Sequence, residues 1–143
     1  MKILLLNGPN LNLLGIREPE IYGRGKLTHV ETELKDFFQD NDHQLVTIQS
    51  NYEGELIDFL HKNMDAAFAI INAGALTHTS IGLHDAFAGT SIPFVEVHIS
   101  NVYAREAYRH LSYLSSLASG SIVGCGLHGY RLAAEIIVKR IEY

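Results

Sequence analysis

The 143-residue chain contains a single cysteine, Cys125, so it cannot form an internal disulfide bond. One free thiol fits a reducing compartment, because disulfides are rare where thiols are kept reduced. The chain also lacks an excess of positive charge. Its formal net charge of −5 gives no basis for attraction to nucleic acid or to an anionic membrane surface.

Long hydrophobic runs are missing as well. Residues 3–6 follow Lys2 and superficially resemble a signal peptide, but the run is too short and ends at Asn7. No stretch approaches the length of a membrane span. We therefore expect a soluble cytoplasmic protein without a targeting segment. A chain of this length can bury a sizeable core, so we expect one catalytic domain, residues 1–143.

Short apolar runs alternate with helical periodicity along the chain. The expected strands are residues 3–6, 45–49, 67–71, 93–97 and 121–123. The expected helices begin at a capping box at Thr28 and near Ser50, and cover residues 80–88, 104–114 and 127–141. This alternation predicts βαβ units and an α/β fold: a flavodoxin-like, doubly wound sandwich with a five-stranded parallel sheet. Ligands of such sheets bind beyond the carboxyl ends of the strands, at the switch point.

Residues 7–25 lack both a helix and a strand period, and they carry Arg17 and Tyr22. Long irregular segments in compact domains are usually functional or disordered, and this one is too rich in Leu and Ile for a linker. Tyrosine is a poor base at its reference pKa of about 10, but a nearby guanidinium favours the phenolate. The pattern indicates an active-site cover. The alternative is an ordinary tyrosine whose ring packs against the domain.

Polar residues gather where the third and fourth expected strands end. Glu96 and His98 are two positions apart on a strand, so their side chains share a face. A carboxylate beside an imidazole fixes its tautomer and favours its charged form, which suits a proton donor. The alternative is a histidine that is merely hydrogen-bonded in the core.

An anion site is the second feature of these strand ends. Ser100 and the backbone amides after the fourth strand could hold an anion, and Arg105 and Arg109 lie one turn apart if residues 104–114 are helical. The arginines could equally form a solvated helix face. After the third strand, the polar residues Asn72, His78, Thr79 and Ser80 could instead be turn and N-cap residues.

Three stretches of the chain together resemble the type II 3-dehydroquinate dehydratase family. They are Gly8-Pro9-Asn10-Leu11-Asn12-Leu13-Leu14-Gly15-x-Arg17-Glu18-Pro19-x-x-Tyr22-Gly23, Asn72-Ala73-Gly74-x-x-Thr77-His78-Thr79-Ser80, and Glu96-Val97-His98-Ile99-Ser100-Asn101-Val102-x-Ala104-Arg105-Glu106. The motifs occur in the family's order, and no catalytic position departs from it. The resemblance implies a flavodoxin-like fold and the dehydration of 3-dehydroquinate to 3-dehydroshikimate. The reaction is an anti elimination through an enolate, without metal or cofactor.

The resemblance also implies a role for each matching residue. Tyr22 would be the base, Arg17 would keep it reactive, and Asn10 would position a water against the enolate oxygen. His98 would protonate the leaving hydroxyl, with Glu96 orienting it. The implied substrate-binding residues are Asn72, His78, Asp85, Ile99, Ser100 and Arg109.

The family's assembly is implied in the same way. Its members form trimers packed into a homododecamer, in which Asp85 would reach the site of a neighbouring subunit. The resemblance does not separate biosynthesis through the shikimate pathway from quinate catabolism, because both use this chemistry.

Other enzyme and binding classes fit the residues less well. Gly124–Gly129 matches G-x-G-x-x-G, but it follows the last strand, where a second nucleotide-binding half has no room. The eight histidines include no H-E-x-x-H motif, and a receiver domain would need acidic residues where Asn7 and Gly8 stand. No lysine is expected at the carboxyl end of a strand, where a Schiff base would be needed.

Overall fold

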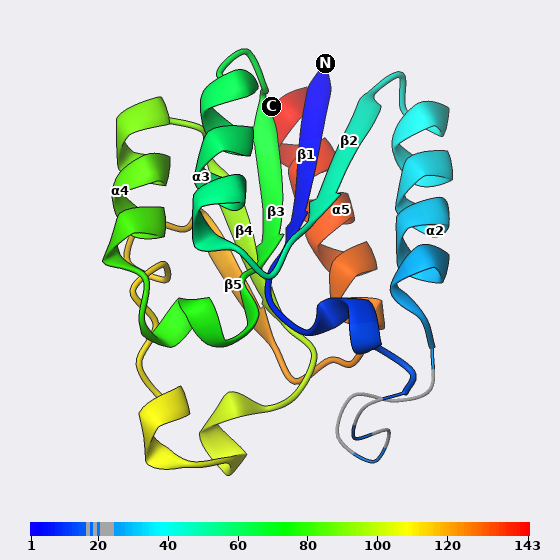
Figure 1. Ribbon diagram of the computed structural model, residues 1–143. Helices are drawn as coiled ribbons and strands as arrows, with labels where there is room; N and C mark the ends of the chain where they lie inside the picture. Colours follow the sequence, from blue (N-terminus) through cyan, green and yellow to red (C-terminus); the bar gives the residue numbers. More distant parts are fainter. Residues whose placement is uncertain (17, 19, 21–24) are drawn as a thin grey trace.

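The computed structural model describes residues 1–16, 18, 20 and 25–143. Within these ranges, five strands form one parallel sheet in the order β2-β1-β3-β4-β5 (Figure 1). The strands are β1 (Lys2–Asn7), β2 (Gln44–Gln49), β3 (Phe68–Asn72), β4 (Phe94–His98) and β5 (Gly120–Val123). The prediction of a flavodoxin-like α/β fold with a five-stranded parallel sheet is confirmed.

Helices cover both faces of this sheet. They are α2 (Leu27–Asp40), α3 (Glu53–Lys62), α4 (Ile81–Thr90) and α5 (His128–Glu142). Figure 1 shows α3 and α4 on one face and α2 and α5 on the other. Because successive side chains of a strand point to opposite faces, a sheet covered on both sides requires the continuous apolar runs that the sequence shows.

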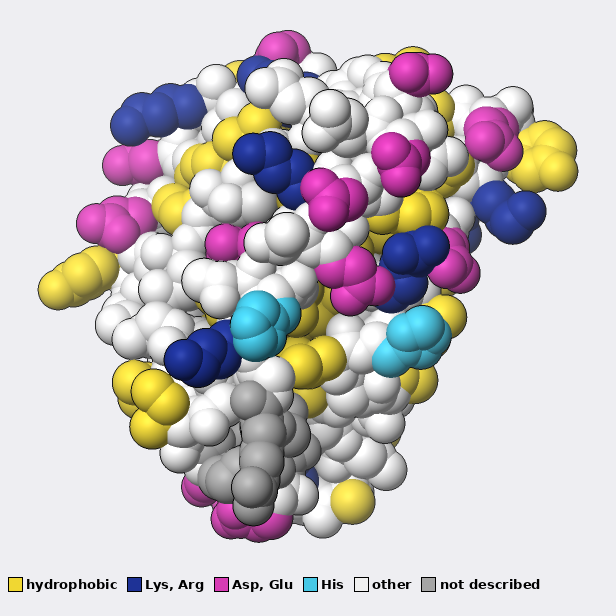
Figure 2. Space-filling view, turned by 90° about the vertical axis from the view of Figure 1, so that its right-hand side faces the viewer, with side chains coloured by type: hydrophobic (Ala, Val, Ile, Leu, Met, Phe, Trp, Pro, Cys, Tyr) yellow, Lys and Arg dark blue, Asp and Glu magenta, His cyan; other side chains and the backbone are white. Residues whose placement is uncertain are grey.

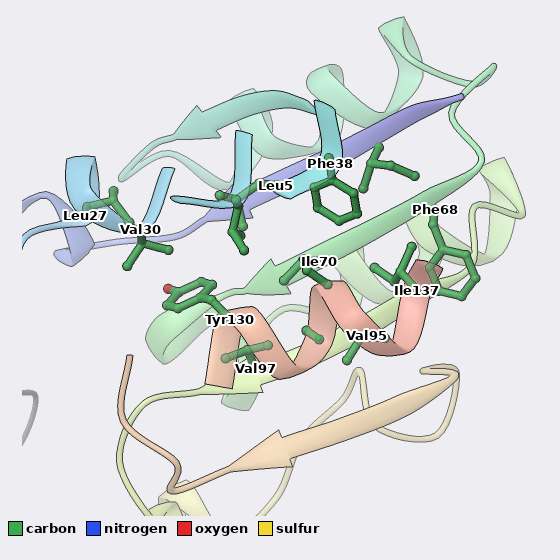
Figure 3. Packing of buried hydrophobic residues seen from close by; sticks show 14 of the residues in the cluster. Leu5, Leu27, Val30, Phe38, Phe68, Ile70, Val95, Val97, Tyr130 and Ile137 are labelled. Carbon is green, nitrogen blue, oxygen red and sulfur yellow. The ribbon is translucent and has the colours of Figure 1, made fainter. Parts of the chain in front are cut away.

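The central strand β1 illustrates this division of the core. Ile3 and Leu5 are fully buried on the face of α2 and α5, whereas Leu4 and Leu6 are fully buried on the face of α3 and α4. Figure 3 shows Leu5 in the first of these two clusters. The sheet is thereby anchored on both sides. Its carboxyl edge is a rigid platform for the segments that follow each strand.

Two expected helix starts have different outcomes. Ser80 caps α4, since its Oγ accepts a hydrogen bond from the amide of Leu83 at 2.9 Å. The capping box at Thr28 is wrong: α2 begins at Leu27, after Lys26, without a side-chain cap.

The expected helix over residues 104–114 is also wrong. The structure has only two short 3₁₀ turns there, η3 (Val102–Ala104) and η4 (Ala107–Arg109). Backbone groups that a helix would pair internally bond elsewhere. The amide of Tyr113 donates to the carbonyl of Thr77 at 2.9 Å, and the Leu111 carbonyl accepts from the His78 ring. Tertiary partners therefore override helix propensity in this segment.

Acidic, basic and apolar side chains are interspersed on the side of the molecule that carries α2 (Figure 2). None of the helices in the described ranges is long and apolar enough to cross a membrane.

Candidate active site

A cavity of about 250 Å³ lies at the carboxyl edge of the sheet. Its lining comes from the segments that follow β1, β3 and β4. The chain leaves β1 towards α2 and leaves β3 towards α4, on opposite faces of the sheet. The cavity therefore lies at the switch point, where ligands of doubly wound sheets bind, as predicted.

His98 and Glu96 form a direct pair at this cavity. His98 Nε2 lies 2.7 Å from Glu96 Oε2, which confirms that the two side chains share a face of β4. The side chains are only 8% and 1% exposed. Because an ionised carboxylate can only accept, Nε2 carries the hydrogen, and Nδ1 is the ring nitrogen left to exchange a proton with a ligand.

The Glu96 carboxylate is surrounded by hydroxyl groups. Its Oε2 accepts from Ser112 at 2.7 Å and from Thr77 at 3.5 Å, and its Oε1 accepts from Ser115 and, at 3.3 Å, from Ser121. Burial raises the pKa of Glu96, but the hydrogen bonds from His98 and Ser115, the charge on His98 and the Ser112 hydroxyl outweigh it. The net effect lowers that pKa below its usual value. Glu96 is thus held as a buried anion facing the imidazole.

His78 supplies a second imidazole to the cavity. Its Nδ1 lies 2.7 Å from the carbonyl oxygen of Leu111, which can only accept, so Nδ1 carries a hydrogen. The His78 and His98 rings are stacked, with centroids 6.3 Å apart and planes 18° from parallel. The bond to Leu111 fixes the ring, and Nε2 is the nitrogen that remains for a ligand.

Two guanidinium groups give the cavity a cationic wall. Arg109 Nε lies 2.7 Å from Glu106 Oε2, and Arg105 Nη1 donates to Ser100 Oγ at 3.2 Å. Their side chains are only 18% and 15% exposed. The expectation that the two arginines lie one turn apart on a helix is wrong, but both of them line the cavity. This wall suits an anionic ligand.

Asn10 enters the cavity from the segment after β1. Its backbone is left-handed, with φ 68° and ψ −2°. Its amide donates to Asn51 Oδ1 at 3.0 Å, and Gln49 Nε2 donates to the Gly8 carbonyl at 3.2 Å. The end of β2 and the segment after it therefore hold Asn10 in a conformation that non-glycine residues rarely adopt.

The predicted site residues separate into three groups. Those that line the cavity are Asn10, Asn72, His78, His98, Ile99, Ser100 and Arg109, and Glu96 contacts His98 from behind. Asp85 lies on α4, 71% exposed and hydrogen-bonded to His84, away from the described lining. Arg17 and Tyr22 lie outside the described residues.

Several residues at the site were not predicted from the sequence. They are the hydroxyl residues around Glu96: Thr77, Ser112, Ser115 and Ser121. A buried carboxylate requires hydrogen-bond donors, so the serine-rich stretch after Leu111 could have indicated where the donors to Glu96 come from. Among residues 1–16, 18, 20 and 25–143, no group of three His, Cys, Asp or Glu side chains is placed to hold a metal ion.

Comparison with known proteins assigns a family to this geometry. Residues 1–138 match the family described as dehydroquinase class II. The chain belongs to that family.

Close relatives of this dehydroquinase match over nearly their whole length. A 3-dehydroquinate dehydratase from Halorhodospira halophila is 53% identical over 142 residues, covering 98% of this chain and 96% of the relative. A catabolic 3-dehydroquinase from Candida dubliniensis is 52% identical over 138 residues, covering 94% of each chain. The crystal structure of the type II dehydroquinase from Butyrivibrio crossotus superposes with a TM-score of 0.92 at 41% identity, covering 96% of this chain and 97% of that one.

The glycine motif after β5 has a structural role in this dehydroquinase. Gly124 and Gly126 have φ values of +81° and +61°, which favour glycine. The Gly124 amide donates to the His98 carbonyl at 3.1 Å, and the Gly126 amide donates to the Ile99 carbonyl at 3.0 Å. The turn thus secures the strand end that carries His98.

Proposed function

We propose that this dehydroquinase removes water from 3-dehydroquinate to give 3-dehydroshikimate. The observation that carries the proposal is the buried Glu96–His98 pair beside two guanidinium groups in the switch-point cavity. An acid held by a carboxylate and a cationic wall match an anionic substrate that loses a hydroxyl group. Relatives at about half identity carry the corresponding names.

The proposed elimination proceeds through an enolate. Tyr22 removes the proton alpha to the ketone, with Arg17 favouring its phenolate, and the electron pair of the C–H bond moves into the enolate. Asn10 positions a water against the enolate oxygen. The enolate then collapses and expels the hydroxyl, which takes a proton from His98 and leaves as water. Base and acid both come from the chain, so the proposal needs no metal or cofactor.

The substrate carboxylate is assigned to Ile99 and Ser100. The Arg105 guanidinium donates to Ser100 Oγ, which places positive charge beside this position. Asn72, His78 and Arg109 line the same cavity and would bind the hydroxyl groups and the remaining charge. Such an arrangement supplies orientation as well as affinity.

Assembly and location are further parts of the proposal. We expect a single catalytic domain that forms a cytoplasmic homododecamer, a tetramer of trimers. The exposed position of Asp85 on α4 is compatible with contact to a neighbouring subunit. A monomeric mass by light scattering would rule out this assembly.

The direct test follows the ultraviolet absorbance of the conjugated enone when 3-dehydroquinate is added. Wild type should turn over and Tyr22→Phe should be almost inactive, whereas full activity of the variant would refute the proposed base. Borohydride with substrate should leave wild type active, and a trapped lysine adduct would contradict acid–base elimination.

A further inference from the structure

Tyr130, in the first turn of α5, links the ends of the two central strands. Its hydroxyl donates to Asn7 Oδ1 at 2.6 Å and accepts from Asn72 Nδ2 at 2.9 Å. Asn7 and Asn72 are paired neighbours at the ends of β1 and β3. Figure 3 shows the ring near Val30 and Val97, on the face of the sheet that α5 covers. One buried hydroxyl therefore connects the carboxyl ends of β1 and β3 at the switch point.

The contacts of Asn72 fix the orientation of its side-chain amide. The amide of Gly74 donates to Asn72 Oδ1 at 3.1 Å, so the Asn72 side chain cannot be turned round without placing donor against donor. Its Nδ2 must then donate to the tyrosine hydroxyl, whose own proton goes to Asn7 Oδ1.

This network is nearly free of solvent. Tyr130, Asn7 and Asn72 are 1%, 0% and 3% exposed. Burial raises the pKa of Tyr130 far above its ordinary value, although the hydrogen bond from Asn72 opposes this, so the hydroxyl keeps its proton at every physiological pH. Within the described part of the chain, Asn7 Nδ2 is buried without a hydrogen-bond partner, so Asn7 is not fully satisfied by this arrangement.

Asn72 is the member of this network that lines the cavity. Its two tethers use one hydrogen of Nδ2 and one lone pair of Oδ1. One N–H donor and one acceptor site therefore remain for a ligand, and their directions are set by the tethers. A free asparagine would have to lose side-chain entropy on binding, whereas this one is already oriented.

We infer that Tyr130 is a positioning residue that orients the Asn72 amide so that it offers an N–H donor to an oxygen of the bound substrate. The inference rests on the proposed function for the identity of that substrate. Tyr130 acts only through Asn72, and its hydroxyl rather than its ring carries the effect. A tyrosine that merely fills the core would contribute to stability and leave turnover by the folded enzyme unchanged.

The test compares Tyr130→Phe with Ile137→Val in the assembled enzyme. Both residues are buried on α5 in the same cluster, but Ile137 has no polar contact with Asn72. We expect Tyr130→Phe to lower kcat/KM about ten- to a hundredfold, because small misplacements of substrate-orienting groups have effects of that size. Ile137→Val should lower the Tm without changing kcat/KM.

A double variant shows whether Tyr130 acts through Asn72. In the Asn72→Ala background, Tyr130→Phe should have no further effect on kcat/KM. An unchanged kcat/KM in Tyr130→Phe, or an equal loss in both backgrounds, would overturn the inference.

If wild type failed to dehydrate 3-dehydroquinate, that result would refute the proposed function and not the positioning role of Tyr130. An NMR measurement tests the positioning role independently of activity. The Asn72 side-chain Nδ2 protons should shift and exchange faster in Tyr130→Phe than in Ile137→Val. Identical signals in wild type and Tyr130→Phe would overturn the positioning role.

Discussion

Glu96 accepts a 2.7 Å hydrogen bond from His98 while its other contacts come from neutral hydroxyl groups. Among the hydrogen-bond partners that the described residues supply to Glu96, His98 is therefore the only one that can carry a charge. The hydroxyls stabilise the carboxylate without neutralising it, so its charge stays available to a protonated imidazole. Loss of the Glu96 charge should therefore impair the function of His98 even when the shape of the Glu96 side chain is kept.

Glu96→Gln should remove that charge and keep the shape of the side chain. Hydroxyl groups can rotate to suit an amide, but an amide cannot stabilise the imidazolium form of His98. We expect kcat to fall about a hundredfold or more, in the range typical of impaired general acid catalysis. Steady-state kinetics on 3-dehydroquinate measure it. Glu135→Gln, an exposed change on α5, is the matched control and should retain wild-type kcat.

The same carboxylate should make stability depend on pH. The pKa of Glu96 is lower in the folded protein than its usual value, because the hydrogen bonds from His98 and the serines outweigh burial. Its contribution is complete above the unfolded-state pKa, about 4.3, and is lost as the pH falls through the lower folded-state pKa. The difference in the free energy of unfolding between wild type and Glu96→Gln should be constant above the unfolded-state pKa and should shrink as the pH falls below it.

Urea unfolding at a fixed protein concentration measures this difference, since assembly makes stability depend on concentration. Glu135→Gln should show a small difference from wild type at every pH. A wild-type advantage over Glu96→Gln that persists undiminished to pH values well below the folded pKa would contradict an ionised Glu96 in the native state.

The sequence predicted the sheet well because its three central strands, β1, β3 and β4, are buried on both faces. Continuous apolar runs bounded by turn residues left few alternatives for β1 and β3, and the strand ends then located the cavity. The alternation of side chains along a strand likewise predicted correctly that Glu96 and His98 lie together. These features depend on local pattern and on the general geometry of parallel sheets.

The segment between β4 and β5 could not be predicted in this way. Residues 104–114 have acceptable helix formers, yet their conformation depends on distant partners. Ser112 donates to Glu96, and the Tyr113 amide donates to Thr77. The link between Tyr130 and Asn72 spans 58 residues and is equally invisible to local periodicity. Local patterns do not reveal which distant donor satisfies a buried group.

Asn51→Ala should reduce activity without a large loss of stability. The Asn51 side chain accepts from the backbone amide of Asn10 and is itself exposed, so its removal releases the left-handed Asn10 rather than opening the core. We expect kcat/KM to fall about tenfold through misplacement of the Asn10 side chain. Kinetics and thermal unfolding together separate the two effects.

Asn63→Ala is the control for this change. Asn63 follows α3 at the opposite end of the sheet, where its side chain contacts the Phe59 carbonyl and Lys2. Its loss should lower the Tm and leave kcat/KM unchanged. If Asn51→Ala behaved like Asn63→Ala, the Asn51 contact would not matter for catalysis.

Gly8→Ala should be severely destabilising because the ends of β1 and β3 approach closely. A Cβ at Gly8 would lie 2.3 Å from the carbonyl oxygen of Ala73, and the Gly8 amide donates to the Asn72 carbonyl at 2.8 Å. Relief requires the strand ends to separate, at a cost of about 1–3 kcal/mol or more in the free energy of unfolding. The same movement displaces the backbone that leads to Asn10 and should lower kcat/KM.

Gly54→Ala provides the matched comparison in the first turn of α3. A Cβ there would meet nothing within 4 Å, and the site is helical, so alanine should stabilise by about 0.4–1 kcal/mol. Urea unfolding of the two variants should therefore shift in opposite directions, with activity lost only in Gly8→Ala. Equal stability of both variants would mean that the ends of β1 and β3 can separate freely, which is incompatible with a preformed cavity at the switch point.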